Sequence, residues 1–357
     1  MPITLKGLDL LITYNCVSQC AHCCYRAGPG RGGRLTAAEV EGYLRQVADH
    51  PLEWVMLFGG EPFIYLDDLV AMVTAVRRHP TAQPTVFTNA YWAYQEEVAR
   101  RKLARLREAG LDRIAFSVDA FHSAFVPVAR VALAVRVAQA LGFSQIDLDN
   151  QWVIAPDLDI PINAATRRMR DTLAEMVDLS GVRVWDSRTR PVGRAAELLP
   201  ELLRRAGKMP QGLCEAKGLC IAPYYLGADL RAPHTVEIHP DGEVNLCAGM
   251  SLGNARQTPL ARILADYDYT NYPVIRTIVE GGPVALLAQA EAAGYQRLPD
   301  YINPCHLCYE VRRFLQPGQP RQLAPAAVYV PARGDSSGWA GSLSPESIFA
   351  RLSATGA

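Results

Sequence analysis

The 357-residue sequence has no apolar stretch approaching the ~20 residues that a membrane-spanning helix needs. Its first residues also lack the charged segment and cleavable apolar core of a secretion signal. Net charge is absent as well, because 36 Lys and Arg residues balance 36 Asp and Glu residues. That balance argues against the broad basic surface of a nucleic-acid-binding protein. We therefore expect a cytoplasmic protein with neither a membrane nor a nucleic-acid partner.

Cysteine is missing from the middle of the chain, between Cys24 and Cys214. The nine cysteines form two groups instead, namely Cys16, Cys20, Cys23 and Cys24, and Cys214, Cys220, Cys247, Cys305 and Cys308. An odd number of clustered cysteines is unlike a disulfide framework. In a reducing compartment such clusters more often bind metal or take part in catalysis.

Strand-like and helix-like segments alternate over residues 1–205. Apolar or alternating runs predict strands at 8–15, 54–60, 84–90, 113–121, 145–155 and 182–187, with helical periodicity between them. At the first of these helices, Thr36 and Glu39 have the spacing of a capping box. Such alternation implies parallel strands with right-handed crossovers. We predict an α/β fold, a partial (β/α)6 barrel of the TIM type.

Residues suited to catalysis or ligand binding follow the predicted strands. Cys16 follows the first, Gly59-Gly60-Glu61 the second and Asn89 the third, and Asp119 lies at the end of the fourth. Active sites of such barrels lie at the C-terminal ends of the strands. The site is therefore expected along this edge.

The pattern changes beyond residue 205. Residues 206–315 hold the second group of cysteines and a predicted hairpin at 234–247, whose Pro-Asp-Gly favours a tight turn. We predict a small α+β domain there, followed by a tail at 316–357 with a short helix at 344–354.

The first cysteine group has the spacing C-x3-C-x2-C at Cys16, Cys20 and Cys23. Three thiolates on one loop can hold three irons of a [4Fe–4S] cluster and leave the fourth iron open. A structural zinc site would need four ligands. His22 and Cys24 are poor candidates for the fourth, because both are direct neighbours of Cys23. We expect Cys24 to be a small buried residue.

This loop resembles the signature of the radical S-adenosylmethionine (SAM) superfamily. Three further segments resemble that family in the right order, namely Gly59-Gly60-Glu61-Pro62, Phe116-Ser117-Val118-Asp119 and Pro191-Val192-Gly193-Arg194-Ala195. The resemblance covers about residues 8–200. It implies that Cys16, Cys20 and Cys23 bind the SAM cluster and that the Gly-Gly-Glu-Pro segment contacts the amino group of SAM.

Other site residues follow from the same resemblance and from positions at the ends of the predicted strands. The expected cofactor-binding residues are Gly59, Gly60, Glu61, Pro62, Ser117, Asp119, Asn150 and Arg194. Asp119 and His122 are the candidates for a catalytic role. The implied chemistry is reductive cleavage of SAM to a 5′-deoxyadenosyl radical, which abstracts hydrogen from a substrate.

The second cysteine group resembles the twitch domain, the shorter relative of the SPASM domain. Gly242 stands five residues before Cys247, and Cys305 and Cys308 form a C-x2-C pair. The resemblance implies an auxiliary [4Fe–4S] cluster on Cys220, Cys247, Cys305 and Cys308, with Cys214 as the rival for the first position. A structural zinc site on the same thiolates is the alternative.

The substrate is the most open question. The leading hypothesis is oxidation or rearrangement of a small molecule, with the auxiliary cluster assisting electron transfer. The alternative is a peptide maturase that makes a crosslink or an epimerisation. A hypothesis of another class is a non-catalytic metal-binding protein. Both enzyme hypotheses require a reducing partner such as flavodoxin or ferredoxin.

Overall fold

The computed structural model describes residues 2–210 and 229–330, which form two compact units. The first, here called the parallel unit, comprises Gly7–Cys20 and Ala27–Thr189. The second, here called the antiparallel unit, comprises the residues up to Lys6, the segment Ala21–Arg26 and the described residues from Arg190 onward. The chain therefore passes between the units inside the first cysteine loop.

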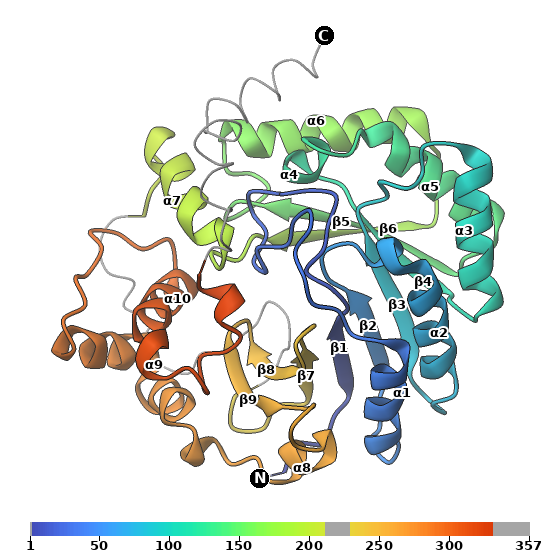
Figure 1. Cartoon of the computed structure of the whole chain (residues 1–357). Coiled ribbons are helices and arrows are strands. Elements are labelled where there is room, and N and C mark those ends of the chain that lie inside the picture. Colours follow the sequence, from blue (N-terminus) through green and yellow to red (C-terminus); the bar gives the residue numbers. More distant parts are fainter. Residues whose placement is uncertain (1, 211–228, 331–357) are drawn as a thin grey trace. The chain divides into compact units, whose positions relative to one another are not determined.

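A sheet of six parallel strands forms the centre of the parallel unit (Figure 1). They are β1 (Gly7–Leu11), β2 (Trp54–Phe58), β3 (Gln83–Thr88), β4 (Arg113–Ser117), β5 (Gln145–Trp152) and β6 (Val182–Arg188), in spatial order β6-β5-β4-β3-β2-β1. Each pairs in parallel with its neighbour in sequence. Among these six strands, β6 pairs with β5 alone, so the barrel is partial. The predicted α/β fold with six parallel strands is confirmed.

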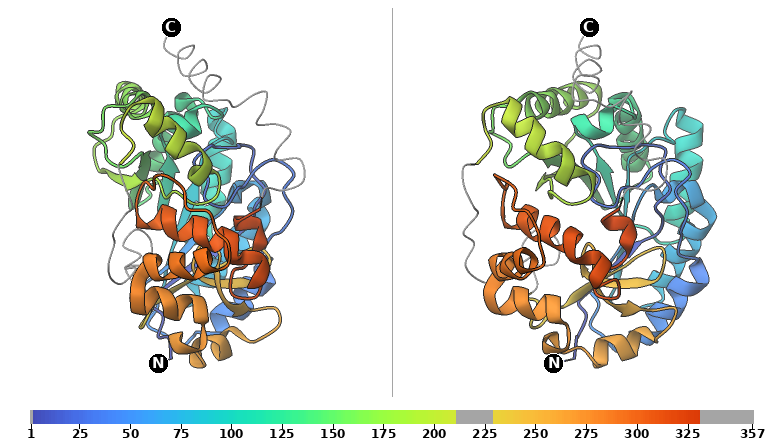
Figure 2. Two further views of the ribbon diagram at one scale, coloured as in Figure 1. Left: turned by 90° about the vertical axis from the view of Figure 1, so that its left-hand side faces the viewer. Right: turned by 60° about the vertical axis from the view of Figure 1, so that its left-hand side comes forward.

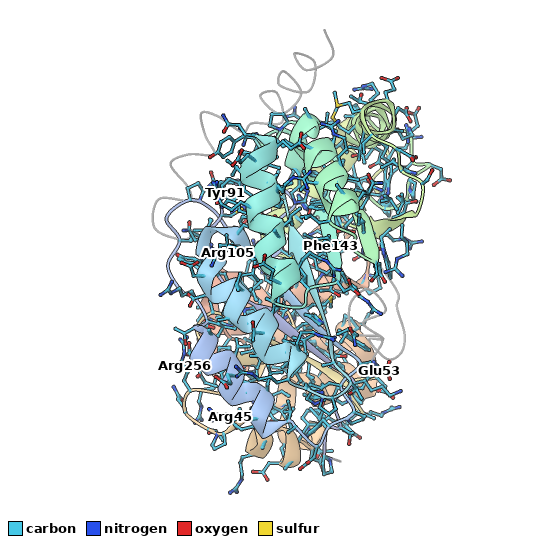
Figure 3. The ribbon with its side chains drawn as sticks, turned by 90° about the vertical axis from the view of Figure 1, so that its right-hand side faces the viewer. Arg45, Glu53, Tyr91, Arg105, Phe143 and Arg256 are labelled. Carbon is cyan, nitrogen blue, oxygen red and sulfur yellow. The ribbon has the colours of Figure 1, made fainter. Side chains whose placement is uncertain are left out.

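Helices separate the strands and lie along one face of the sheet (Figure 1). They are α1 (Ala37–Gln46), α2 (Leu66–Arg77), α3 (Glu96–Glu108), α5 (Val128–Ala140) and α6 (Pro161–Met176), with the short η1 (Pro62–Tyr65) and α4 (Ala120–Ser123). Their apolar sides are buried and their polar sides point outward, as Arg45 on α1 and Arg105 on α3 show (Figure 3).

The first helix begins where the sequence predicts. The Thr36 side chain accepts a hydrogen bond from the Glu39 backbone N–H at 3.2 Å, and Glu39 Oε2 accepts from the Thr36 N–H at 2.7 Å. This reciprocal capping box satisfies two backbone donors that have no partner inside the helix.

The antiparallel unit contains a small sheet of β7 (Thr235–Ile238), β8 (Glu243–Cys247) and β9 (Met250–Asn254). Strands β7 and β8 form the predicted hairpin. The helical elements are α7 (Arg194–Arg205), α8 (Leu260–Ala265), η2 (Tyr269–Asn271), α9 (Pro273–Ala292), α10 (Pro304–Leu315), η3 (Gln316–Gly318) and η4 (Ala326–Val328). Helices α9 and α10 lie side by side (Figure 2).

The two units divide the chain at Arg190, whereas the sequence analysis placed its boundary at residue 205. Helix α7 groups with the antiparallel unit because Gly193 and Arg194 pack on the Cys23–Cys24 backbone. Cys214, Cys220 and the predicted helix at 344–354 lie outside the described residues. In the part of the chain that is described, no helix is both long and apolar enough to cross a membrane.

Candidate functional site

The first cysteine loop follows β1 directly. In the parallel unit, the loop is closed by backbone hydrogen bonds from Cys16 N–H to the Gly28 carbonyl and from Gly28 N–H to the Tyr14 carbonyl, both 3.1 Å long. Cys16 and Cys20 are buried, and Cys23 is half-buried. None of the three forms a disulfide with another described cysteine. The loop therefore places Cys16 and Cys20 beyond the C-terminal end of β1.

The surroundings of Cys16 fit an iron–sulfur ligand. The Cys16 Sγ accepts hydrogen bonds from Ser18 N–H at 3.4 Å and from Asn89 Nδ2 at 3.6 Å. Hydrogen bonds to ligating sulfurs are a usual means of setting cluster potentials. The surroundings of Cys16 thus suit a thiolate that binds iron.

The two glycines after β2 allow a very close approach of two backbones. A Cβ added at Gly60 would lie 2.1 Å from the Asn15 carbonyl oxygen, and one at Gly59 would lie 2.7 Å from the Thr13 oxygen. In their place, Gly60 N–H donates to Thr13 and Glu61 N–H donates to Asn15. The Gly-Gly-Glu segment is therefore bonded to the residues that lead into Cys16.

Glu61 is fully buried at the centre of a hydrogen-bond cluster. Its Oε1 accepts from Thr88 Oγ1 at 2.8 Å and from Phe63 N–H at 3.1 Å, and its Oε2 accepts from Asn89 N–H at 2.9 Å. Burial raises the pKa of Glu61 to about 7, because it outweighs the effect of these hydrogen bonds. Both oxygens therefore have protein donors, and Pro62 begins η1 directly after.

Asp119 follows β4 and is completely buried. Its Oδ1 accepts from Phe121 N–H at 2.9 Å and from His122 N–H at 3.0 Å, which caps α4. Its Oδ2 lies 2.8 Å from His122 Nδ1. Burial alone would lower the pKa of His122, but the Asp119 carboxylate raises it above its usual value. The two catalytic candidates thus form one pair, in which Asp119 orients the imidazole.

Two further predicted residues lie on β4 and β5. Ser117, the last residue of β4, is half-buried and pairs in register with Asp149. Asn150 is fully buried on β5, and its Nδ2 donates to Asp186 Oδ1 at 3.3 Å. Its Oδ1 has no hydrogen-bond partner within the described residues. A buried acceptor of this kind fits a polar ligand at the strand ends.

Gly193 and Arg194 contact the third cysteine within the antiparallel unit. The Arg194 N–H donates to the Cys23 carbonyl at 3.1 Å. Gly193 has a φ of +63°, and a Cβ there would lie 2.4 Å from the Cys24 carbonyl oxygen. The Arg194 side chain is buried. The glycine is thus required both by its left-handed backbone and by the close approach.

The second cysteine group gathers in the antiparallel unit. Cys247 ends β8, while Cys305 and Cys308 lie one turn apart on α10. Burial raises the pKa of Cys305 to about 12, and the neighbouring Cys247 and Cys308 add to the effect. The three cysteines are therefore near enough to influence one another's ionisation, and thiolates are the ligands that zinc and iron–sulfur clusters prefer.

Cations face this second group. The buried Arg312 donates to the Ala248 carbonyl at 2.8 Å, and its charge opposes the rise in the pKa of Cys308 that burial causes. Arg190 acts in the same direction on Cys305. A [4Fe–4S] cluster with four thiolates carries net negative charge, so guanidinium groups close to these cysteines fit such a cluster.

Several residues of these surroundings escaped the sequence analysis as site residues. Asn89 was noted at a strand end, but its bonds to Cys16 and Ser18 need the folded loop. Arg190, Tyr25 and Glu237 were not singled out. The available signal was position alone, because Arg190 directly precedes the Pro-Val-Gly-Arg-Ala segment and Tyr25 follows the cysteine loop.

A cavity of about 500 Å³ lies elsewhere in the parallel unit. Its lining includes Tyr91, Lys102 and Arg105, and Figure 3 labels Tyr91 and Arg105. Arg105 is paired with Asp67 at 2.7 Å. None of the predicted ligands or cofactor-binding residues lines this cavity.

The cysteine loop, the Gly-Gly-Glu packing and the parallel sheet agree with one family of enzymes. Residues 10–141 match the family model of the radical SAM superfamily. This part of the chain is thus similar to a radical SAM domain, and the likeness supports an enzyme.

Comparison with individual proteins gives more distant likenesses. A probable GTP 3′,8-cyclase of Methanothermobacter thermautotrophicus is 31% identical over 118 residues, which are 33% of this chain and 36% of the relative. Among solved structures, BtrN in complex with AdoMet and 2-DOIA has 14% identity and a TM-score of 0.44, with 79% of this chain and 89% of BtrN covered. SuiB of Streptococcus suis bound to S-adenosylmethionine has 15% identity and a TM-score of 0.41, with 73% of this chain covered. The chain spans about a third of the cyclase and 66% of SuiB.

Proposed function

We propose that this enzyme cleaves SAM reductively and uses the resulting radical to remove hydrogen from a substrate. The observation that carries the proposal is the Gly59–Glu61 segment bonded to Thr13 and Asn15, directly before the three-cysteine loop. These bonds connect the Gly-Gly-Glu-Pro segment to the residues that precede the cysteine loop. Both segments resemble family signatures, and they lie within the residues that match the family model.

Cys16, Cys20 and Cys23 would hold the cluster, which supplies the electron that splits SAM into methionine and a 5′-deoxyadenosyl radical. The residues of the chain then bind and orient. The unpartnered Asn150 Oδ1 would accept from a hydroxyl or amino group of SAM. Ser117 and the Gly59–Gly60 backbone would line the same strand ends, where buried surroundings exclude water.

Asp119 and His122 would serve the substrate rather than the cluster. Asp119 orients the imidazole through Nδ1 at 2.8 Å, so that Nε2 would be the nitrogen that carries a proton to or from a substrate. Because the carboxylate raises the pKa of His122, the ring holds its proton to a higher pH than an isolated histidine. It would therefore act as a proton donor to the substrate.

Cys247, Cys305 and Cys308 would hold an auxiliary [4Fe–4S] cluster of the twitch or SPASM type. Cys220, or its rival Cys214, would complete the four ligands. A cluster with four cysteine ligands has no open iron, which suits electron transfer better than substrate coordination. The other use of these thiolates, a structural zinc site, predicts a different metal content.

A small-molecule substrate is favoured over a peptide. The cyclase that shares 31% identity with part of this chain is named for a nucleotide substrate. Oxidation or rearrangement of a small molecule remains the leading reaction class, and peptide maturation is the alternative. Flavodoxin or ferredoxin would supply electrons.

The deciding experiment measures iron, acid-labile sulfide and zinc per chain after anaerobic reconstitution, together with 5′-deoxyadenosine formed from SAM and dithionite. We expect about eight irons per chain and SAM cleavage. Cys20→Ala should lose about four irons and abolish cleavage, whereas the matched control Cys24→Ser should keep its iron.

Two results would overturn parts of the proposal. About four irons with one zinc would make the second cysteine group a structural zinc site. Fully loaded protein that forms no 5′-deoxyadenosine would point to a non-catalytic metal-binding protein.

A further inference from the structure

A chain of hydrogen bonds that leads from half-buried to buried surroundings begins at the Cys23–Tyr25 segment of the antiparallel unit. Arg190 Nη2 donates to Cys24 Sγ at 3.5 Å and to Tyr25 Oη at 3.2 Å. The Tyr25 hydroxyl donates to Glu237 Oε2 at 2.5 Å. One guanidinium thus contacts the two residues that follow Cys23 and, through Tyr25, reaches strand β7.

The chain continues from Glu237 to the strand that bears a second-group cysteine. His239 Nε2 lies 2.6 Å from Glu237 Oε1 and 3.2 Å from Asn245 Nδ2. Glu237 and Asn245 are direct partners in the β7–β8 pair, and Cys247 follows two residues after Asn245. Polar contacts therefore run from the loop of the first cysteine group to the strand of the second.

The Glu237 end of this chain is deeply buried, whereas Arg190 is half-buried. Glu237 and His239 are 4% and 0% exposed. Burial alone would raise the pKa of Glu237, but His239, Arg190 and Tyr25 together lower it. Glu237 is therefore an anion that interacts with the Arg190 cation through Tyr25, in surroundings that screen charge less than water does.

The backbone of the same segment clamps the third cysteine. Arg194 N–H holds the Cys23 carbonyl, and Gly193 approaches the Cys24 carbonyl too closely for any side chain. Arg190, four residues before Arg194, donates hydrogen bonds to the side chains of Cys24 and Tyr25. These contacts hold its charge beside the two residues that follow Cys23.

We propose that Arg190 is a positioning residue shared by the two cysteine groups, and that its charge raises the reduction potential of the cluster at each of them while Glu237 lowers it. The inference rests on the proposed clusters. A cluster gains one negative charge on reduction, so a nearby cation favours the reduced form and a nearby anion opposes it. The guanidinium suits this role because it stays charged at every accessible pH.

The test is a redox titration of the reconstituted protein, followed by the electron paramagnetic resonance signals of the two clusters. In Arg190→Gln we expect the ratio of reduced to oxidised cluster at a fixed potential to fall about tenfold, which is about 59 mV for one electron. Glu237→Gln should move the same signals in the opposite direction. Arg190→Lys, which keeps the charge, should stay closer to the wild-type protein.

Control variants distinguish the effect of the Arg190 charge from structural damage to the site. The exposed Arg276 lies in the same unit, so Arg276→Gln removes one positive charge without touching either group. A Cys20→Ala background isolates the signal of the second cluster. Iron is measured in every variant, because a wild-type protein with one cluster overturns the auxiliary-cluster part of the proposed function, whereas two clusters with unmoved potentials refute this inference alone.

Two outcomes would overturn the role of Arg190. One is a shift in Arg190→Gln no larger than that in Arg276→Gln. The other is a shift of the same sign in Arg190→Gln and Glu237→Gln, which would indicate general loosening of the site. If Arg190→Gln fails to keep its iron, Glu237→Gln decides, since an upward shift supports the inference and no shift refutes it.

Discussion

Two glycines and two carboxylates at this site are each explained by the atoms that surround them. Gly60 is a glycine because the Asn15 carbonyl occupies the place of a side chain, and Gly193 because the Cys24 carbonyl does. The buried Glu61 carboxylate accepts hydrogen bonds from three donors. The Asp119 oxygens accept hydrogen bonds from the backbone of α4 and lie next to His122 Nδ1. The family motifs are thus built into the packing around the cysteine loop as well as into its chemistry.

The raised pKa of Glu61 makes stability depend on pH. In the folded protein the pKa is about 7, against an ordinary value of 4.5, so the native state binds the proton more tightly than the unfolded chain. Stability should therefore fall as the pH rises from about 4.5 to about 7, and then level off. Glu61→Gln cannot ionise and should lack this component.

The measurement is urea unfolding of cluster-free protein at pH 5, 6, 7 and 8. We expect the unfolding free energy of the wild-type protein to fall, relative to that of Glu61→Gln, as the pH rises to about 7. A difference that stays constant with pH would show that Glu61 titrates normally.

At the scale of elements, order along the chain places the site. Each strand of the parallel unit leads into a loop at the same edge, so Cys16, Glu61, Asn89 and Asp119 gather there although they are far apart in sequence. Local signals predicted these elements well, because periodicity and turn residues are properties of short segments. The bonds of Glu61 to Thr88 and Asn89 were not predictable, because they join separate elements.

Helix α1 offers a test at this scale, since its start is a capping box of Thr36 and Glu39. Thr36→Ala removes the acceptor for the Glu39 N–H and should cost about 1 kcal/mol. Thr36→Ser keeps the hydroxyl and should cost less. Hydrogen exchange of the first turn of α1, together with the thermal midpoint, would measure both, and equal exchange in the two variants would contradict the role of the cap.

At the scale of the whole molecule, two units share the cysteine loop. Cys16 and Cys20 belong to the parallel unit, while Cys23 belongs to the unit that also carries Cys247, Cys305 and Cys308. The chain thus passes from one unit to the other between Cys20 and Cys23. Within the antiparallel unit, Arg190 and Gly193 contact the residues next to Cys23.

Removing the second group tests how independent the first remains. Cys247→Ala with Cys305→Ala and Cys308→Ala should lower iron from about eight to about four per chain. SAM cleavage without substrate should persist at roughly its wild-type rate, because Cys16, Cys20 and Cys23 are intact. Iron analysis and 5′-deoxyadenosine assays would show this, and a complete loss of cleavage would mean that the first cluster needs the second for its assembly.

The sequence by itself determined the alternation of strands and helices, the spacing of the cysteine loop and the order of the Gly-Gly-Glu-Pro, Ser-Val-Asp and Gly-Arg-Ala segments. These features depend on residues that are close in the chain. Only the tertiary structure decided which donors satisfy Glu61, that Asp119 holds His122, and that Arg190 joins Cys24 to Tyr25 and Glu237. The reason is physical: burial of charge and hydrogen bonding between distant segments exist only once the chain has brought those segments together.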